Sequence, residues 1–309
     1  MFSQYFGHYL LNKEMITSEQ LKAALELQKT THVKFGVIAV DEGLLTTAQV
    51  EAVHERQKQQ DKRFGEIAVE LGFLSNEQVE YMLNVQKNNH LLLAQAIVDQ
   101  NYMTMDAFSK ALNDYKRMYS LSDESFEAIK NGDIDAIVKN IIHLAETEKQ
   151  EYAQYLSLFV KNMIRFIDEQ AYIELNPVTS ELKVDWLVTQ EIKGEELLLT
   201  AIAADEKIFL EIASIYAEEE LTEIDELAKA SVSEFLNLHN GIYLVNMSNY
   251  GIELDMEPQI VQQNAILSLD KDESMNITVH TSKGHFQLVL SKLPKHVVFS
   301  SANQENQAV

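Results

Sequence analysis

The sequence contains no cysteine and is poor in the two residues that break helices. Its 309 residues include only 3 prolines and 10 glycines. Without cysteine the chain can form neither a disulfide nor a thiolate metal site, so we expect a cytoplasmic protein. The scarcity of proline and glycine favours long helices.

Long apolar runs are also missing. No stretch of 18 or more apolar residues occurs, so we expect no membrane span. The first 15 residues lack a basic segment followed by an apolar one, and we therefore expect no signal peptide. The sequence has no P-loop, no GxGxxG, no HExxH and no GxSxG motif, which argues against the enzyme classes that carry them.

Basic residues are scarce in the second part of the chain. The net charge is -23. Residues 1–118 contribute about -3 of it and residues 119–309 about -20. An acidic surface repels phosphate backbones, so we expect no DNA or RNA partner. The nearly neutral first part can still hold a small anion.

A repeat of 29 residues runs through the first part. The pair that opens each unit is Phe6-Gly7, Phe35-Gly36, Phe64-Gly65 and, in the fourth unit, Leu93-Ala94. In each unit a hydroxyl residue stands ten positions after the second residue of this pair: Thr17, Thr46, Ser75 and Thr104. Such a residue suits a helix N-cap. Each unit is predicted to be a short helix, a turn and a longer helix, and four units should share one core.

Two of these units resemble the 24-residue motif of the MshE N-terminal family, which includes the N-domains of type II secretion and type IV pilus ATPases. The matching segments are residues 34–57 and 63–86, with the five residues 58–62 between them. In that family two such motifs form a cyclic-di-GMP site. The resemblance implies that cyclic-di-GMP is a ligand, bound by Lys34, Phe35, Gly36, Gln57, Arg63, Phe64, Gly65, Glu66 and Gln86.

These residue types suit a ligand with two phosphates and two guanines. The fork of Arg63 can bind a guanine edge or a phosphate, and a glycine after the aromatic lets backbone approach closely. Lys34 stands where the family prefers arginine, and lysine cannot make the same bidentate contact. Phe35 and Phe64 replace the usual leucine. The alternative is a helical repeat for packing or protein contact, with no nucleotide.

The pattern changes after residue 118. We expect a helical connector at 119–150, a second domain at 151–295 and a polar tail at 296–309. Alternating residues predict strands at 182–192, 197–202, 252–256, 276–280 and 286–290. Asp205 can cap one helix, and Thr222 with Asp225 resembles a capping box for a longer one. The predicted fold class is α+β: an all-α repeat module, then long helices on an antiparallel sheet.

The most specific motif of the second part is residues 234–241, Glu-Phe-Leu-Asn-Leu-His-Asn-Gly. Together with the acidic segment 218–225 before it, this motif resembles the phosphatase helix of the CheC/CheX chemotaxis family, and the resemblance covers residues 152–292. An earlier helix offers Asn162 but has Phe159 where the glutamate would stand, so the chain is closer to the single-motif CheX type. CheX-type proteins are dimers, and a homodimer is implied.

The resemblance assigns catalysis to Glu234 and Asn237. Residues at i and i+3 lie on one helix face, here between the small residues Ala230 and Gly241. In the family this face docks on a phosphorylated response regulator of the CheY type. Asn237 would orient the attacking water, and Glu234 would pair with a lysine of the regulator. No cofactor of its own is implied, because the regulator would hold Mg²⁺.

The leading hypothesis is a phosphatase for a receiver domain, with a cyclic-di-GMP-sensing first module. The alternative is a non-catalytic adaptor or scaffold that binds a receiver domain or cyclic-di-GMP without hydrolysis. By itself a Glu–Asn pair at this spacing often lies on a solvated helix face. Leu227 and Phe235 are expected in the core. His239, where the family prefers an aliphatic residue, is either a surface side chain or a disturbance in the packing.

Overall fold

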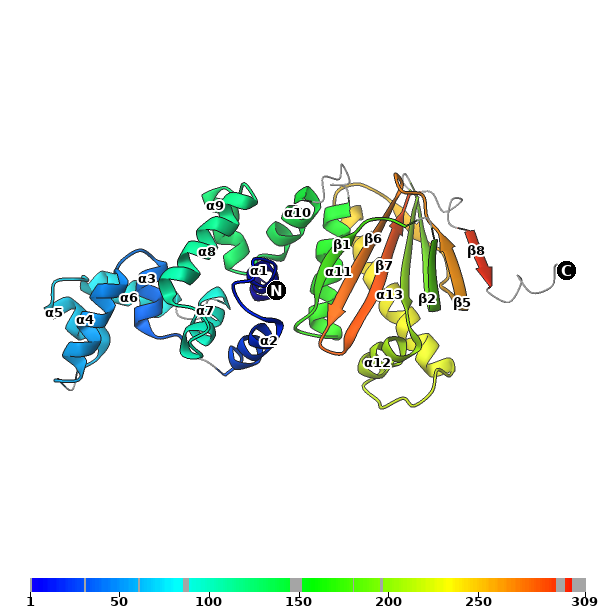
Figure 1. The fold of residues 1–309 in the computed structure, drawn as a ribbon. Helices are drawn as coiled ribbons and strands as arrows, with labels where there is room; N and C mark the ends of the chain where they lie inside the picture. Colours follow the sequence, from blue (N-terminus) through cyan, green and yellow to red (C-terminus); the bar gives the residue numbers. More distant parts are fainter. Residues whose placement is uncertain are drawn as a thin grey trace. The chain divides into compact units, whose positions relative to one another are not determined.

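The computed structural model describes residues 2–30, 32–60, 62–85, 89–144, 152–179, 181–194, 197–292 and 298–301. The chain divides into two compact units, Met1–Ile137 and Val138–Val309 (Figure 1). Within the described residues, no helix is long and apolar enough to cross a membrane.

The first unit is helical. Its elements are α1 (Phe2–Asn12), α2 (Ser18–Leu27), α3 (Phe35–Asp41), α4 (Thr47–Gln57), α5 (Phe64–Glu70), α6 (Asn76–Val85), α7 (Asn89–Asp99), α8 (Met105–Met118), α9 (Asp123–Lys130) and the start of α10 (Ile134–Leu144). The predicted caps are confirmed, because each hydroxyl accepts a hydrogen bond from the backbone N–H three residues on: Thr17, Thr46, Ser75 and Thr104. A single four-repeat module stays a prediction.

The glycines of the repeat lie where a short helix meets the next one. A Cβ atom on Gly36 would lie 2.7 Å from Cγ1 of Val50, and one on Gly65 would lie 2.9 Å from Cγ1 of Val79. Real side chains do not approach this closely, so only glycine lets α3 pack on α4 and α5 on α6. The aromatic–glycine repeat therefore has a packing role that does not depend on a ligand.

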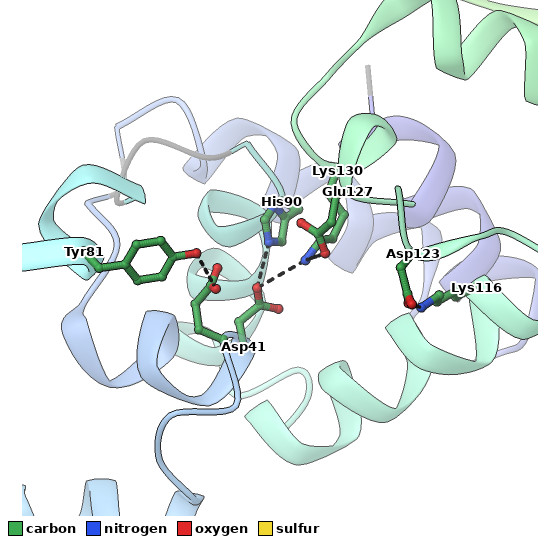
Figure 2. Close-up of polar contacts among 8 residues, drawn as sticks. Asp41, Tyr81, His90, Lys116, Asp123, Glu127 and Lys130 are labelled. Carbon is green, nitrogen blue, oxygen red and sulfur yellow. Dashed lines mark hydrogen bonds and ion pairs between the residues drawn. The ribbon is translucent and has the colours of Figure 1, made fainter. Parts of the chain in front are cut away.

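Buried charges join α9 to the first unit (Figure 2). Nε2 of His90 lies 2.9 Å from Oδ2 of Asp41, and Nζ of Lys130 lies 3.7 Å from the same oxygen. Burial by itself would raise the pKa of Asp41, but the hydrogen bond from His90 and the charges of His90 and Lys130 lower it overall. The boundary between the two units falls after Ile137, so α9 belongs to the first unit, and the connector expected at 119–150 stays a prediction.

The second unit is a sheet with helices packed against it. Its helices after α10 are α11 (Ala153–Phe166), α12 (Glu206–Ala217) and α13 (Glu226–Ser248), and its strands are β1 (Tyr172–Asn176), β2 (Glu181–Gly194), β3 (Leu198–Ala204), β4 (Leu254–Met256), β5 (Ile260–Ser268), β6 (Ser274–Thr281), β7 (Gly284–Ser291) and β8 (Val298–Ser301). The strand order is β1-β6-β7-β3-β2-β5-β8, with β4 also paired to β2. All pairings are antiparallel, so the predicted mixture of helices and antiparallel sheet is confirmed.

Three strands and one helix start differ from expectation. The alternation of polar and apolar residues did not predict β1, β5 or β8, and β8 lies within the segment 296–309 assigned to a polar tail. The long helix α13 begins after Asp225, whose side chain accepts from the N–H of Ala228, rather than after Thr222. α12 and α13 pack against each other and both contact β2, which places the face of α13 beside this central strand.

Candidate functional site

Glu234 and Asn237 lie side by side on α13. Nδ2 of Asn237 donates to Oε2 of Glu234 over 3.3 Å. Glu234 is exposed and Asn237 is half-buried, so the pair opens to solvent while the Asn237 amide also reaches inward. Leu227, expected in the core, is 45% exposed on the same helix, whereas Phe235 is fully buried as expected. The exposed face of α13 thus has an apolar residue near its start and a carboxylate–amide pair near its middle.

The Asn237 amide is held from the sheet by Gln190 of β2. Nε2 of Gln190 donates to Oδ1 of Asn237 over 3.1 Å and to the backbone carbonyl of Glu257 over 2.9 Å. Gln190 stands where the neighbour of β2 changes, since β5 pairs as far as Thr189 and β4 pairs from Ile192. The free Glu257 carbonyl in this gap obtains its donor from the Gln190 side chain.

Gln190 is in turn fixed by a buried network. Nδ2 of Asn240 donates to Oε1 of Gln190 (2.8 Å) and to Oγ1 of Thr200 (2.9 Å), while the Tyr155 hydroxyl donates to Oδ1 of Asn240 (2.7 Å). The Thr200 hydroxyl donates to the backbone carbonyl of Gln190 over 3.1 Å. Burial raises the pKa of Tyr155 far above its usual value, so this phenol stays a donor. No pattern in the sequence points to Gln190, Thr200 or Tyr155.

His239 is part of the core and does not disturb it. Its side chain is fully buried, with its ring edge-on to Tyr155 (centroids 4.4 Å apart) and Phe159 (5.1 Å). Nδ1 lies 3.1 Å from Nδ2 of Asn162, a hydrogen bond between two buried side chains. Burial lowers the pKa of His239 to about 3. Asn162 is thus a buried partner of His239, which rules out its use as a second exposed catalytic amide.

Two further side chains shape the surroundings of the pair. Tyr216, at the end of α12, stacks edge-on to Phe235, and its pKa is raised first by burial and then by the negative charge of Glu234. Lys193 of β2 forms an ion pair with Glu257 (2.7 Å), and this hydrogen bond raises the Lys193 pKa. The backbone of Glu257 also donates to the Glu191 carbonyl, so the residue that holds Gln190 is tied at three points.

This arrangement suits the positioning of a small polar molecule better than proton transfer. An amide does not titrate in water, and among the described residues the only side-chain acid or base that Asn237 contacts is the exposed Glu234. A held amide can orient a water molecule, and an adjacent exposed carboxylate can pair with a cation on a partner protein.

The residues predicted to bind cyclic-di-GMP only partly come together. Gln57 donates to the backbone carbonyl of Lys62 (3.2 Å), beside the exposed Arg63, while Glu66 accepts from the backbone N–H of Arg63 (2.8 Å). Phe64 stacks edge-on to His54. Gln86 lies outside the described residues.

In the copy of the motif at residues 34–57, Lys34 contacts two residues of α7. The Lys34 amine forms an ion pair with Asp99 (2.7 Å), and its backbone N–H donates to Oε1 of Gln95 (3.0 Å). Phe35 is half-buried, and Gly36 packs against Val50. Lys34 and Gly36 line a hollow of about 840 Å³ on the first unit, whereas Gln57, Arg63 and Glu66 do not. The two halves of the predicted site thus have different surroundings.

No family model matches this sequence, and no curated protein matches it either. Solved structures of CheX- and CheC-like chemotaxis proteins do match a little under half of the chain. CheX from Desulfovibrio desulfuricans is 14% identical, covering 45% of this chain and 96% of its own, with a TM-score of 0.37. A CheC-like protein from Shewanella sp. PV-4 is 19% identical, covering 44% and 93%, with a TM-score of 0.38.

A complex of CheX with CheY, BeF3 and Mg²⁺ from Borrelia burgdorferi also matches, at 15% identity, covering 47% of this chain and 94% of that one, with a TM-score of 0.39. The homodimer and cyclic-di-GMP stay predictions. The described residues contain no group of three or more His, Asp or Glu side chains that could hold a metal ion.

Proposed function

We propose that the second unit is a phosphatase for the aspartyl phosphate of a CheY-like receiver domain. The observation that carries the proposal is the Glu234–Asn237 pair on the open face of α13, with the Asn237 amide held from the sheet. The resemblance of residues 234–241 to the CheX phosphatase helix supports it. The proposal does not rest on the likeness to solved structures.

The reaction is a hydrolysis in which this chain mainly positions groups. Water attacks the phosphorus in line, its oxygen forms the new P–O bond, and the bond to the receiver aspartate breaks. The aspartate leaves as a carboxylate, and inorganic phosphate takes up the remaining proton of the water or releases it to solvent. Asn237 orients the water and Glu234 pairs with a cation of the receiver. Mg²⁺ at the receiver's own site would neutralise charge on the phosphoryl oxygens.

The test is Asn237→Ala in the full chain. Loss of one positioning group is expected to lower the rate of receiver dephosphorylation on the order of 100-fold, while the receiver still binds. The measurement follows phosphate release from CheY-type receiver domains phosphorylated with acetyl phosphate. Asn246→Ala is the matched control, because it makes the same change on the same helix nine residues away and should leave the rate unchanged.

The alternative function, a non-catalytic adaptor, gives a different result. It predicts that the wild-type protein binds the receiver without accelerating dephosphorylation over the receiver's own rate. That outcome, across the receivers tested, would reject the phosphatase and leave Glu234 as a docking residue.

For the first unit we propose cyclic-di-GMP binding as a second function. It is supported by the exposed Arg63 beside Gln57 in the turn between α4 and α5, where the two motif copies join. Calorimetric titration of cyclic-di-GMP is expected to show saturable heat that Arg63→Ala removes. Lys58→Ala removes a charge from the same turn and should leave the binding heat unchanged, because Lys58 pairs with Glu55. Absence of heat in the wild type would leave the repeats with packing or protein contact.

A further inference from the structure

Gln190 lies behind the proposed catalytic amide and contacts it directly. Its side chain is 1% exposed, so it touches neither solvent nor a docked receiver. It stands on β2, 47 residues before Asn237, and it belongs to no motif in the sequence. A buried glutamine whose amide contacts the inner side of the half-buried Asn237 amide can control which end of that amide faces outward.

Two backbone carbonyls determine which end of each side-chain amide in this network is the oxygen and which is the NH₂ group, because a carbonyl can only accept hydrogen bonds. The Glu257 carbonyl lies 2.9 Å from Nε2 of Gln190, so that end of the Gln190 side chain must be the NH₂ group. The second hydrogen of this NH₂ group then goes to Asn237, 3.1 Å away, which must present its oxygen. Asn237 is left with its NH₂ group beside Glu234.

The other carbonyl gives the same answer independently. The Thr200 hydroxyl donates to the backbone carbonyl of Gln190, so its oxygen accepts from Asn240. The Asn240 NH₂ group then donates its second hydrogen to Oε1 of Gln190, and Oδ1 of Asn240 accepts from Tyr155. Both ends of the chain of bonds therefore require the Gln190 NH₂ group to face Asn237.

We propose that Gln190 is a positioning residue of the phosphatase: it holds Oδ1 of Asn237 inward, so that Asn237 presents its N–H donors to the attacking water. A donor directed at one lone pair of the water oxygen leaves the other lone pair for phosphorus. A free amide could turn over and present its carbonyl, which would bind the water through a hydrogen instead. This inference rests on the proposed phosphatase function.

The closing experiment compares three variants of the full chain. Gln190→Glu keeps the size but places a carboxylate against Oδ1 of Asn237, which favours the turned-over amide. Gln190→Met keeps the size and removes the hydrogen bonds. Ser291→Ala removes a buried side-chain hydrogen bond of the same unit, the one from Ser274, which lies outside this network, so it is the structural control. Initial rates over a range of phosphorylated CheY-type receiver give kcat and KM, and thermal unfolding gives Tm.

We expect kcat to fall about tenfold in Gln190→Met and further in Gln190→Glu, with KM within about twofold of the wild type, because the docking face is unchanged. Ser291→Ala should lower Tm but retain kcat within about threefold. If Gln190→Glu retains the wild-type kcat, or if kcat simply follows Tm across all three variants, Gln190 is structural and the inference is wrong. Failure of the wild type itself to accelerate dephosphorylation would instead reject the phosphatase.

If Gln190→Glu does not fold, the proposal is tested by asking whether the Tm losses of two single variants add up in the double variant. Tm is measured for Gln190→Met, Asn237→Ala and the double variant. Tm losses smaller in the double variant than the sum of the single losses show that the two side chains interact as proposed. Additive losses would show that Gln190 does not hold Asn237.

Discussion

At the scale of single residues, the second unit buries several polar side chains that form hydrogen bonds with one another. Tyr155, Asn240, Gln190 and Thr200 satisfy each other's hydrogen bonds, as buried polar groups must. His239 differs from them, because its Nε2 is one of several buried polar atoms with no hydrogen-bond partner in the described structure. A buried neutral histidine makes stability depend on pH.

The pH dependence follows from the His239 pKa, which burial lowers from 6.5 to about 3. Between these values the unfolded chain binds the proton and the folded chain does not. The free energy of unfolding should therefore fall as the pH drops below 6.5, by up to about 1.4 kcal/mol per pH unit from this residue. Urea unfolding of the wild type and of His239→Leu at pH 7.0, 6.0 and 5.0 measures how the free energy of unfolding changes with pH.

The difference between the two proteins isolates His239 from the carboxylates, which titrate in both. The wild type should lose stability relative to His239→Leu as the pH falls. Parallel curves over this range would show that the folded protein protonates His239 readily, contrary to its burial.

At the scale of elements, a buried ion pair attaches α9 to the rest of the first unit, which the sequence pattern of α9 did not indicate. Lys130 has a side chain 8% exposed and pairs with Asp41 of α3 and with Glu127. Lys116 of α8, by comparison, pairs with Asp123, whose side chain is 94% exposed. Both lysines also lie over the ring of Phe126. Figure 2 shows both ion pairs, of which the Lys130–Asp41 pair is buried and the Lys116–Asp123 pair is largely exposed.

We expect Lys130→Met to lower the free energy of unfolding of the first unit by about 3 kcal/mol, because it leaves Asp41 buried with His90 as its main partner. Lys116→Met should cost less than about 1 kcal/mol, as exposed ion pairs do. Urea unfolding followed by far-UV circular dichroism gives both values. Equal losses in the two variants would contradict the role of burial.

At the scale of the whole molecule, each unit has its own core, and a single tryptophan distinguishes them. Trp186 lies on β2 in the second unit, 7% exposed and next to Phe209. Its fluorescence therefore reports the unfolding of the second unit, whereas circular dichroism reports helices in both.

We expect the two units to unfold as separate transitions. Lys130→Met should shift the circular dichroism curve and leave the Trp186 fluorescence midpoint unchanged. His239→Leu at pH 7 should shift the fluorescence midpoint. A fluorescence midpoint that moves as far with Lys130→Met as the circular dichroism midpoint would show one cooperative unit instead of two.

The sequence by itself determined the features that depend on near neighbours along the chain. The helix caps at Thr17, Thr46, Ser75, Thr104 and Asp205 form as predicted, because a cap needs only the next three residues. The Glu234–Asn237 pair could be placed on one helix face for the same reason. The strands at 182–192 and 197–202 were predicted because their alternating or continuous apolar residues carry the signal locally.

Tertiary structure alone decided the features that depend on distant partners. The alternating pattern is weak in β5, whose strand is made by pairing with β2, and the same holds for β1 against β6. The role of Gln190 could not be found in the sequence, since it arises where β2, the end of β4 and α13 meet. His239 is interpreted as a core residue only once α11 supplies Asn162, Tyr155 and Phe159. Such contacts are set by packing, which no local pattern encodes.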